Sequence, residues 1–162
     1  MEPLESTSIH LIQRSIVRFM QMFPSDGVRQ PDIDEFNNQM KFEIENIRDF
    51  IILHYHVTNR TDTPFWRHCR TMEIPESLQH RIDLFKETGR VFKVPTELFG
   101  ENSWTQVMLG QGLSPEQYHP IVNMMDEQEL RDFLGGIHGS VERLVSQLPE
   151  HQRFIDHYCR EA

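Results

Sequence analysis

A carboxylate and three hydroxyl side chains lie side by side near the start of the chain, as Glu5, Ser6, Thr7 and Ser8. The residues that follow have helical periodicity, and Ser or Thr before a helix can accept hydrogen bonds from its first, unpaired amides. The same amides, together with the positive end of the helix dipole, attract anions such as halide or phosphate. The dipole contributes only about 0.3–1 kcal/mol when exposed, so a bound anion needs further enclosure. Two interpretations are open: simple capping, which is the commoner use of such residues, and an anion site.

Histidine and cysteine provide weaker candidates for chemistry. The chain has nine histidines, but the spacing of His54 and His56 does not place two ligands on one helical face. Cys69 and Cys159 are far apart in the sequence, which excludes a CxxC pair and a disulfide-stapled scaffold. His68 adjoins Cys69, yet neighbouring helical side chains diverge by about 100°. We expect no metal site and no cysteine nucleophile.

The elements that must position these residues are helices. Apolar residues recur at helical spacing through most of the chain, and caps, prolines and glycines mark the ends of the segments. Thr63 before Pro64 indicates a helix start, Gly89 a helix end, and Asp126 with Glu129 a capping arrangement. Residues 90–94 alternate like a strand, but without a partner strand we expect an extended connection. The pattern predicts an all-α fold with helices over residues 9–23, 32–51, 64–69, 75–88, within 97–112, over 126–148 and from 154 to the end.

Composition limits the class of protein. A length of 162 residues suits one domain. The formal net charge of −9 opposes nonspecific binding to nucleic acid, and no apolar run approaches the roughly 18 residues that a membrane span needs. The first residues are acidic where a secretory signal would be basic and then apolar, so we expect a cytoplasmic location.

Four ordered blocks carry a resemblance to a known family. They are PLESTSI at 3–9, DFIILHY at 49–55, DTPFW at 62–66 and FGENSW at 99–104. The chain resembles the C-terminal part of the flavin-dependent tryptophan halogenases over essentially its whole length. The resemblance implies one helical C-terminal region over residues 1–162, which would normally pack on an FAD-binding α/β domain that this chain lacks.

The resemblance also implies an activity and roles for individual residues. In that family, reduced FAD and oxygen oxidise chloride or bromide to hypohalous acid, and a lysine delivers the halogen to an aromatic ring. By motif, Glu5 is the glutamate that assists this step. Backbone groups of Thr7 and Ser8 match the halide site, and Ile9 matches a residue near the flavin. Ser8 stands where better-known members carry glycine, which leaves the choice of halide open.

The expected substrate is a small electron-rich aromatic. Relatives that act on free tryptophan hold its amino-acid end with an adjacent tyrosine pair, and this chain has no such pair. An indole or a similar ring needs apolar and aromatic walls, which Phe99 and Trp104 could provide. The alternative, that Phe99 and Trp104 are core aromatics seating the short helix, is equally open.

Two family features are missing from this sequence, namely a GxGxxG after a strand and the halogen-carrying lysine. We therefore expect the isolated chain to bind FAD poorly and to be inactive. The partners implied are the FAD-binding part, a flavin reductase that transiently supplies reduced FAD, and the aromatic substrate; a homodimer is also open. The alternative function is a non-catalytic helical interaction module or remnant. Such a module should be monodisperse, whereas a fragment should expose an apolar patch around Pro3 to Phe19 and self-associate.

Overall fold

The computed structural model describes residues 4–94 and 97–159, and for Glu5 only the backbone. Helices are the only regular elements in these residues, so the predicted all-α fold is confirmed. In chain order they are η1 (Leu4–Ser6), α1 (Thr7–Gln21), α2 (Gln30–His56), α3 (Pro64–Thr71), α4 (Glu76–Thr88), α5 (Glu101–Gly110), η2 (Pro120–Met124), α6 (Glu127–Ser146) and α7 (His151–Tyr158).

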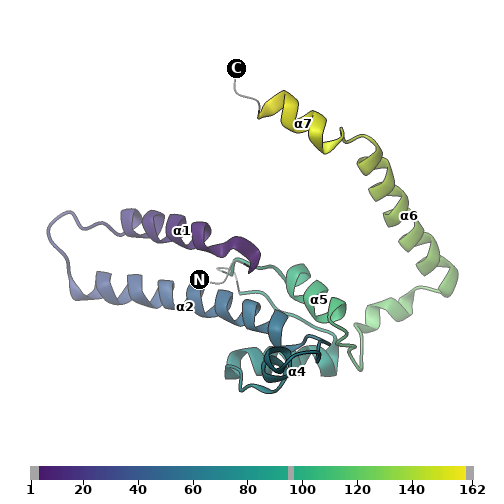
Figure 1. The fold of residues 1–162 in the computed structure, drawn as a ribbon, viewed down its shortest axis with the longest axis horizontal. Helices are drawn as coiled ribbons and strands as arrows, with labels where there is room; N and C mark the ends of the chain where they lie inside the picture. The colour runs from purple at the N-terminus through teal and green to yellow at the C-terminus, as the bar shows by residue number, and fades with distance from the viewer. Residues whose placement is uncertain (1–3, 95–96, 160–162) are drawn as a thin grey trace. The chain divides into compact units, whose positions relative to one another are not determined.

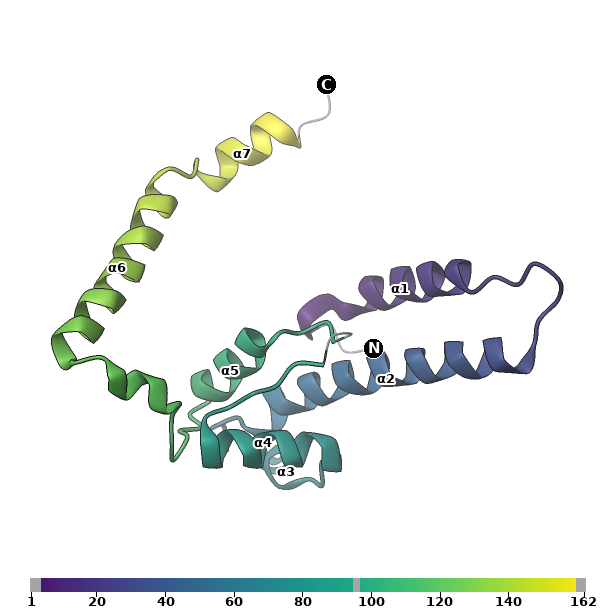
Figure 2. The same cartoon turned by 180° about the vertical axis from the view of Figure 1, so that it is seen from behind.

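Helices α1 and α2 form an antiparallel hairpin, seen side by side from both directions (Figures 1 and 2). As predicted, α1 ends before Pro24, and α2 begins with Pro31 in its first turn. Gly27, in the connection between the two helices, has a φ of 91°, which L side chains rarely adopt. Helix α2 extends to His56, past Ile51, the last residue of the predicted apolar pattern, and Leu53 in this extension is buried.

Three predicted end signals are confirmed. The Thr63 hydroxyl accepts a hydrogen bond from the Trp66 amide at 3.4 Å at the start of α3. Gly89 ends α4 with a φ of 68°. Asp126 and Glu129 form a reciprocal capping box at the start of α6. Each signal depends only on residues within one helical turn, which is why the sequence shows it.

Three other segments test the remaining expectations. Ser6, at the N-cap of α1, has a left-handed φ of 48° and makes no side-chain cap hydrogen bond, so simple capping by Ser6 is wrong. Helix α5 begins at Glu101, directly after Gly100 in the extended N-cap conformation, and so lies within the predicted segment 97–112. Residues 90–94 form no strand and connect α4 to the segment before α5, as expected.

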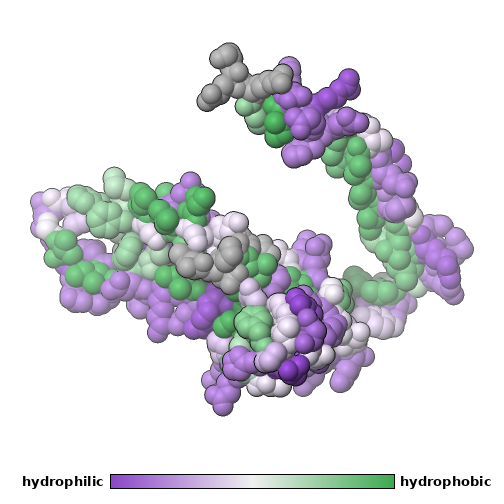
Figure 3. Space-filling model, viewed as in Figure 1, coloured by the Kyte–Doolittle hydropathy of each residue, from purple (hydrophilic) through white to green (hydrophobic). Residues whose placement is uncertain are grey.

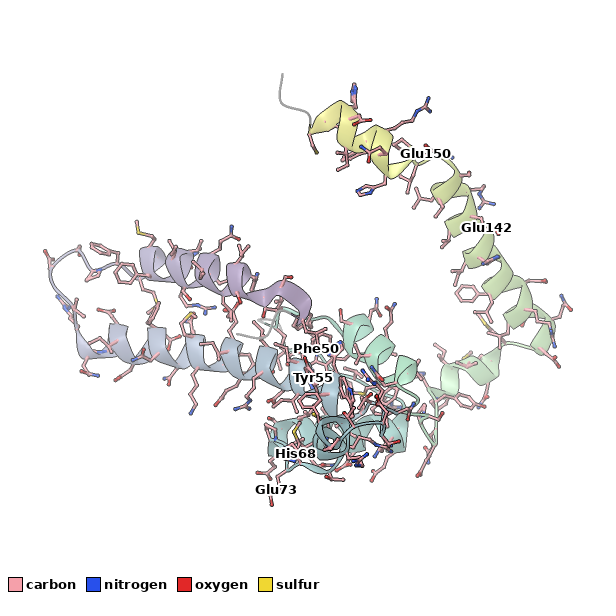
Figure 4. The ribbon with its side chains drawn as sticks, in the orientation of Figure 1. Phe50, Tyr55, His68, Glu73, Glu142 and Glu150 are labelled. Carbon is pink, nitrogen blue, oxygen red and sulfur yellow. The ribbon has the colours of Figure 1, made fainter. Side chains whose placement is uncertain are left out.

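The described residues fall into two packed units that divide between His119 and Pro120. In the first unit, α2 is central and contacts α1, α3, α4 and α5. Phe50 and Tyr55 lie on the C-terminal half of α2, beside the short helices of this unit (Figure 4). The core of this unit consists of Phe50, Leu53, Leu78, Ile82, Phe85, Trp104 and Met108.

The second unit contains η2, α6 and α7, and none of its described residues is buried. Apolar side chains run along α6 at alternating spacings of four and three, as a packing seam does. Figure 3 shows this apolar run on α6 and another apolar region over α1. The α6 residues are Leu130, Leu134, Ile137, Val141 and Leu144, and Leu148 continues the spacing beyond the end of the helix.

Candidate functional site

The segment that precedes α1 forms a single 3-10 turn, Leu4–Ser6, and Thr7 is the first residue of the helix. The left-handed conformation of Ser6 turns the chain sharply into α1. The side chain of Glu5 lies outside the described residues, so its assignment as the catalytic carboxylate stays a prediction. What the structure does establish is that the Glu5 backbone immediately precedes the first amides of α1.

The hydroxyl of Thr7 is buried and has no hydrogen-bond partner among the residues that the structure describes. Thr7 is only 2% exposed, and its Oγ1 is one of two such unpartnered atoms in the described part of the chain. A buried hydroxyl without a partner costs about 1–3 kcal/mol. Thr7 lines an apolar cavity of about 240 Å³ together with Leu11, Ile44, Ile47, Arg48, Ile51 and Ile52. The start of α1 therefore holds a hydrogen-bond donor available to an acceptor from outside the described residues.

The two residues after Thr7 differ in exposure. Ser8 is half-buried, whereas the apolar side chain of Ile9 is 68% exposed. Further large exposed apolar residues follow along α1: Ile12, Ile16, Val17, Phe19 and Met20. This is the apolar surface expected around Pro3 to Phe19, apart from Pro3, which lies outside the described residues.

Phe99 and Trp104 lie in and beside the core of the first unit. The Trp104 side chain is 1% exposed, its ring centroid lies 4.8 Å from that of Phe50, and the Arg81 guanidinium covers it at 4.1 Å. Phe99 stacks on Phe50 with centroids 3.9 Å apart. The structure therefore favours the core interpretation for Trp104, because this ring has no surface left for a ligand. Phe99 keeps a partly exposed ring, and its role as a substrate wall stays a prediction.

A larger cavity, which we call the aromatic cavity, lies where the end of α2 meets α3. It measures about 540 Å³ and is lined by Leu4, His54, Tyr55, Thr58, Asn59, Arg60, Trp66 and Gln111. The Tyr55 and Trp66 rings are stacked with centroids 5.8 Å apart, and the Arg60 guanidinium lies 4.4 Å from the Trp66 ring centroid. Sequence reasoning missed this site, although HY and TPFW occur in two of the blocks that carry the resemblance.

A buried carboxylate joins α1 to α2. Glu43 is 3% exposed and contacts Arg18 at 2.8 Å, His10 at 3.2 Å and Arg14 at 3.3 Å. Burial by itself raises the pKa of Glu43, but hydrogen bonds from Arg18 and His10 and the charges of Arg18 and Arg14 outweigh it, so the pKa is lowered. His10, Arg14 and Arg18 recur at every fourth position and so share one face of α1. This spacing is the signal from which the sequence could have shown a charged face.

The described residues contain neither a metal-type cluster nor a membrane-spanning helix. No group of three or more His, Cys, Asp or Glu side chains converges as a metal site would require. Likewise, none of the described helices is both long and apolar enough to cross a bilayer.

The described residues thus combine an all-helical fold, an orphaned hydroxyl at the start of α1 and an aromatic cavity at the end of α2. Comparison with known proteins identifies the class: the family model described as tryptophan halogenase matches residues 1–127. The chain belongs to the tryptophan halogenase family.

Relatives and solved structures agree with this family. Tryptophan 7-halogenase RebH of Lentzea aerocolonigenes is 26% identical over 95% of this chain and 32% of its own length. The solved structure of Xcc4156, a flavin-dependent halogenase from Xanthomonas campestris, has a TM-score of 0.96 and 54% identity, covering all of this chain and 33% of its own. BrvH, a flavin-dependent halogenase from Brevundimonas sp. BAL3, has a TM-score of 0.91 and 43% identity over 97% of this chain and 32% of its own. This chain thus spans about a third of the length of these relatives.

Proposed function

We propose that this chain is the C-terminal part of a flavin-dependent halogenase that uses reduced FAD, oxygen and chloride or bromide to halogenate an indole, a tryptophan or a related electron-rich aromatic. The observation that carries the proposal is the family match over residues 1–127, which includes the whole Glu5–Ile9 segment. The similarity to Xcc4156 and BrvH, both described as flavin-dependent halogenases, supports it.

The start of α1 fits the halide in this proposal. The amides of the first turn, the positive end of the helix dipole and the Thr7 hydroxyl, which has no partner within the described residues, all favour a small anion. Thr7 and Ser8 would hold the halide through their backbone N–H groups, and the apolar cavity beside Thr7 would exclude competing water.

This chain would provide only a small part of the FAD site. Among the described residues, the exposed Ile9 side chain would give FAD an apolar contact. The groups that bind the phosphates and ribose of FAD would belong to the part of the relatives that this chain does not cover. When bound, reduced flavin supplies the two electrons that activate oxygen. We propose that a reductase delivers it transiently and that the assembled protein works in the cytoplasm.

Glu5 would act on the aromatic ring. After the halogen has added, the ring carries a positive charge and must lose the proton on the halogenated carbon; the Glu5 carboxylate would stabilise that charge and accept the proton. The reaction also needs a lysine from outside this chain, so the isolated 162 residues are expected to be inactive.

The test joins this chain to an FAD-binding part, either as one protein or as two co-expressed pieces. The product should halogenate indole with bromide and a flavin reductase, and Glu5→Gln should lower kcat about 100- to 10,000-fold. Glu45→Gln is the matched control, because Glu45 lies on α2 with a loose 3.9 Å contact to Lys41. Normal activity of Glu5→Gln, or halogenation by the 162 residues alone, would refute the proposal.

A non-catalytic helical module is the second candidate. The exposed apolar residues of α1 and α6 count against it, because a settled module would bury such surfaces. Size-exclusion chromatography of the isolated chain separates the two: a fragment should self-associate and a module should run as a monomer.

A further inference from the structure

We propose that the aromatic cavity binds an aromatic carboxylate, with the ring against Tyr55 and Trp66 and the carboxylate on Arg60. The proposal rests on the proposed function only in taking this ligand to be the halogenation substrate. It places substrate selection on the end of α2 and on α3 rather than on Phe99 and Trp104.

Aromatic side chains form one wall of the aromatic cavity. The rings of Tyr55 and Trp66 are within 16° of parallel, and Phe65 packs edge-on against Trp66 with centroids 5.0 Å apart. Tyr55 comes from the last turn of α2 and Trp66 from the first turn of α3, so two helices hold the pair. A rigid aromatic wall binds a flat ring with little loss of conformational entropy.

Arg60 provides a charged end beside this wall. Its Nε and Nη2 donate to the two carboxylate oxygens of Asp62 at 3.1 and 2.8 Å, which fixes the plane of the guanidinium. Within the described residues Nη1 makes no hydrogen bond. This nitrogen can donate to a ligand carboxylate, and charge-assisted hydrogen bonds are the stronger kind. Arg60 also covers the Trp66 ring, so the ring and the charge belong to one arrangement.

The position of Leu4 links the cavity to the expected chemistry. Leu4 lines the aromatic cavity and is the residue directly before Glu5 in the 3-10 turn. A ligand held between Trp66 and Leu4 therefore lies beside the peptide that carries the predicted catalytic glutamate. The volume, about 540 Å³, lies within the usual range for small-molecule sites.

Binding can be measured without flavin, halide or turnover. The chain has two tryptophans, so 5-fluorotryptophan labelling gives two ¹⁹F resonances, which Trp66→Phe assigns. Titration with indole-3-acetate should shift the Trp66 resonance saturably and leave that of Trp104, which is buried, in place. Indole should bind about tenfold more weakly, and acetate should cause no shift, because neither probe offers both ring and charge.

Arg60→Gln isolates the charged end. It should weaken indole-3-acetate binding about tenfold and leave indole binding unchanged, whereas Arg90→Gln, which removes an exposed charge elsewhere, should change neither. Equal affinity of wild type and Arg60→Gln for indole-3-acetate, or a Trp66 resonance that does not move, would overturn the proposal.

The assembled protein distinguishes this inference from the proposed function. There, Arg60→Gln should raise KM for indole-3-acetate about tenfold with kcat unchanged. If ¹⁹F binding holds but no arene is halogenated, the proposed function fails and the site remains. If halogenation proceeds and Arg60→Gln leaves every KM unchanged, the aromatic-carboxylate site fails and the proposed function remains.

Discussion

Arg18 on α1 donates from Nη1 to the Oε2 of Glu43 on α2 over 2.8 Å, and both side chains are buried between the two helices. The same guanidinium nitrogen lies 3.2 Å from the sulfur of Met40. This ion pair joins α1 to α2, and removing Arg18 would leave the buried Glu43 carboxylate without its closest partner. The hairpin in turn sets where the helix start at Thr7 lies.

Replacing Arg18 should destabilise the first unit. Arg18→Met should lower the free energy of unfolding by about 3 kcal/mol, the lower end for a broken buried pair, because Arg14 and His10 still contact Glu43. Urea unfolding followed by tryptophan fluorescence, to which the buried Trp104 contributes, measures it. The double variant Arg18→Met with Glu43→Met should recover most of the loss. A double variant as unstable as the single one would contradict the role of the unpaired charge.

The ion pair should also make stability depend on pH. The pKa of Glu43 is lowered from 4.5 in the folded protein, so folding favours the ionised carboxylate. Its contribution is therefore complete above the unfolded pKa and is lost as the pH falls through the folded value. Between pH 6 and pH 3, wild type should lose more stability than Glu43→Gln, which has no such proton to take up. Parallel urea-derived curves for the two proteins would contradict this.

Trp104 should behave as a core residue. Trp104→Ala should cost about 3–5 kcal/mol of stability, because it empties a fully buried site against Phe50 and Arg81. Phe92→Ala, at an exposed aromatic outside the core, should change stability by about 0.5 kcal/mol or less. Thermal unfolding of both variants decides the matter. A folded, stable Trp104→Ala that instead lost ligand affinity would restore the substrate interpretation.

Gly89 should tolerate no side chain. Its φ of 68° is left-handed, and a Cβ there would lie 2.6 Å from the backbone oxygen of Gln117. Gly89→Ala should therefore destabilise the first unit by about 2 kcal/mol. Gly110→Ala is the control, since nothing lies within 4 Å of its added Cβ, and it should be neutral or slightly stabilising. Equal melting temperatures for the two variants would show that the α4 end is not constrained.

The parts of the fold that sequence reasoning predicted are those that depend on neighbouring residues. Thr63 with Trp66, Gly89, and Asp126 with Glu129 each act within about one turn, so periodicity and end signals sufficed for the helices. Ser6 is the exception, because its left-handed backbone removed the side-chain cap that its residue type favours.

The site was harder to predict from the sequence, because its contacts join residues that are far apart in the chain. Tyr55 meets Trp66 only after the loop between α2 and α3 has turned, and Arg18 meets Glu43 only across the hairpin. Residue type could not show that Trp104 faces the core and Trp66 a cavity, since tryptophan suits both settings. The resemblance did locate Thr7, whose unpartnered hydroxyl then emerged as an independent structural observation.

The apolar residues along α6 mean that amide exchange in this helix would show whether another surface covers it. Its capping box sets where the helix begins, but within the described residues no side chain of α6 is buried, and most of a helix's stability in a protein comes from packing of its apolar face. When the apolar face of α6 is exposed to solvent, the amide hydrogens of the helix should therefore exchange fast, because the helix opens locally. Slow exchange along α6 would mean that another surface covers it, so deuterium uptake in this one helix can follow the joining of the chain to the proposed FAD-binding part.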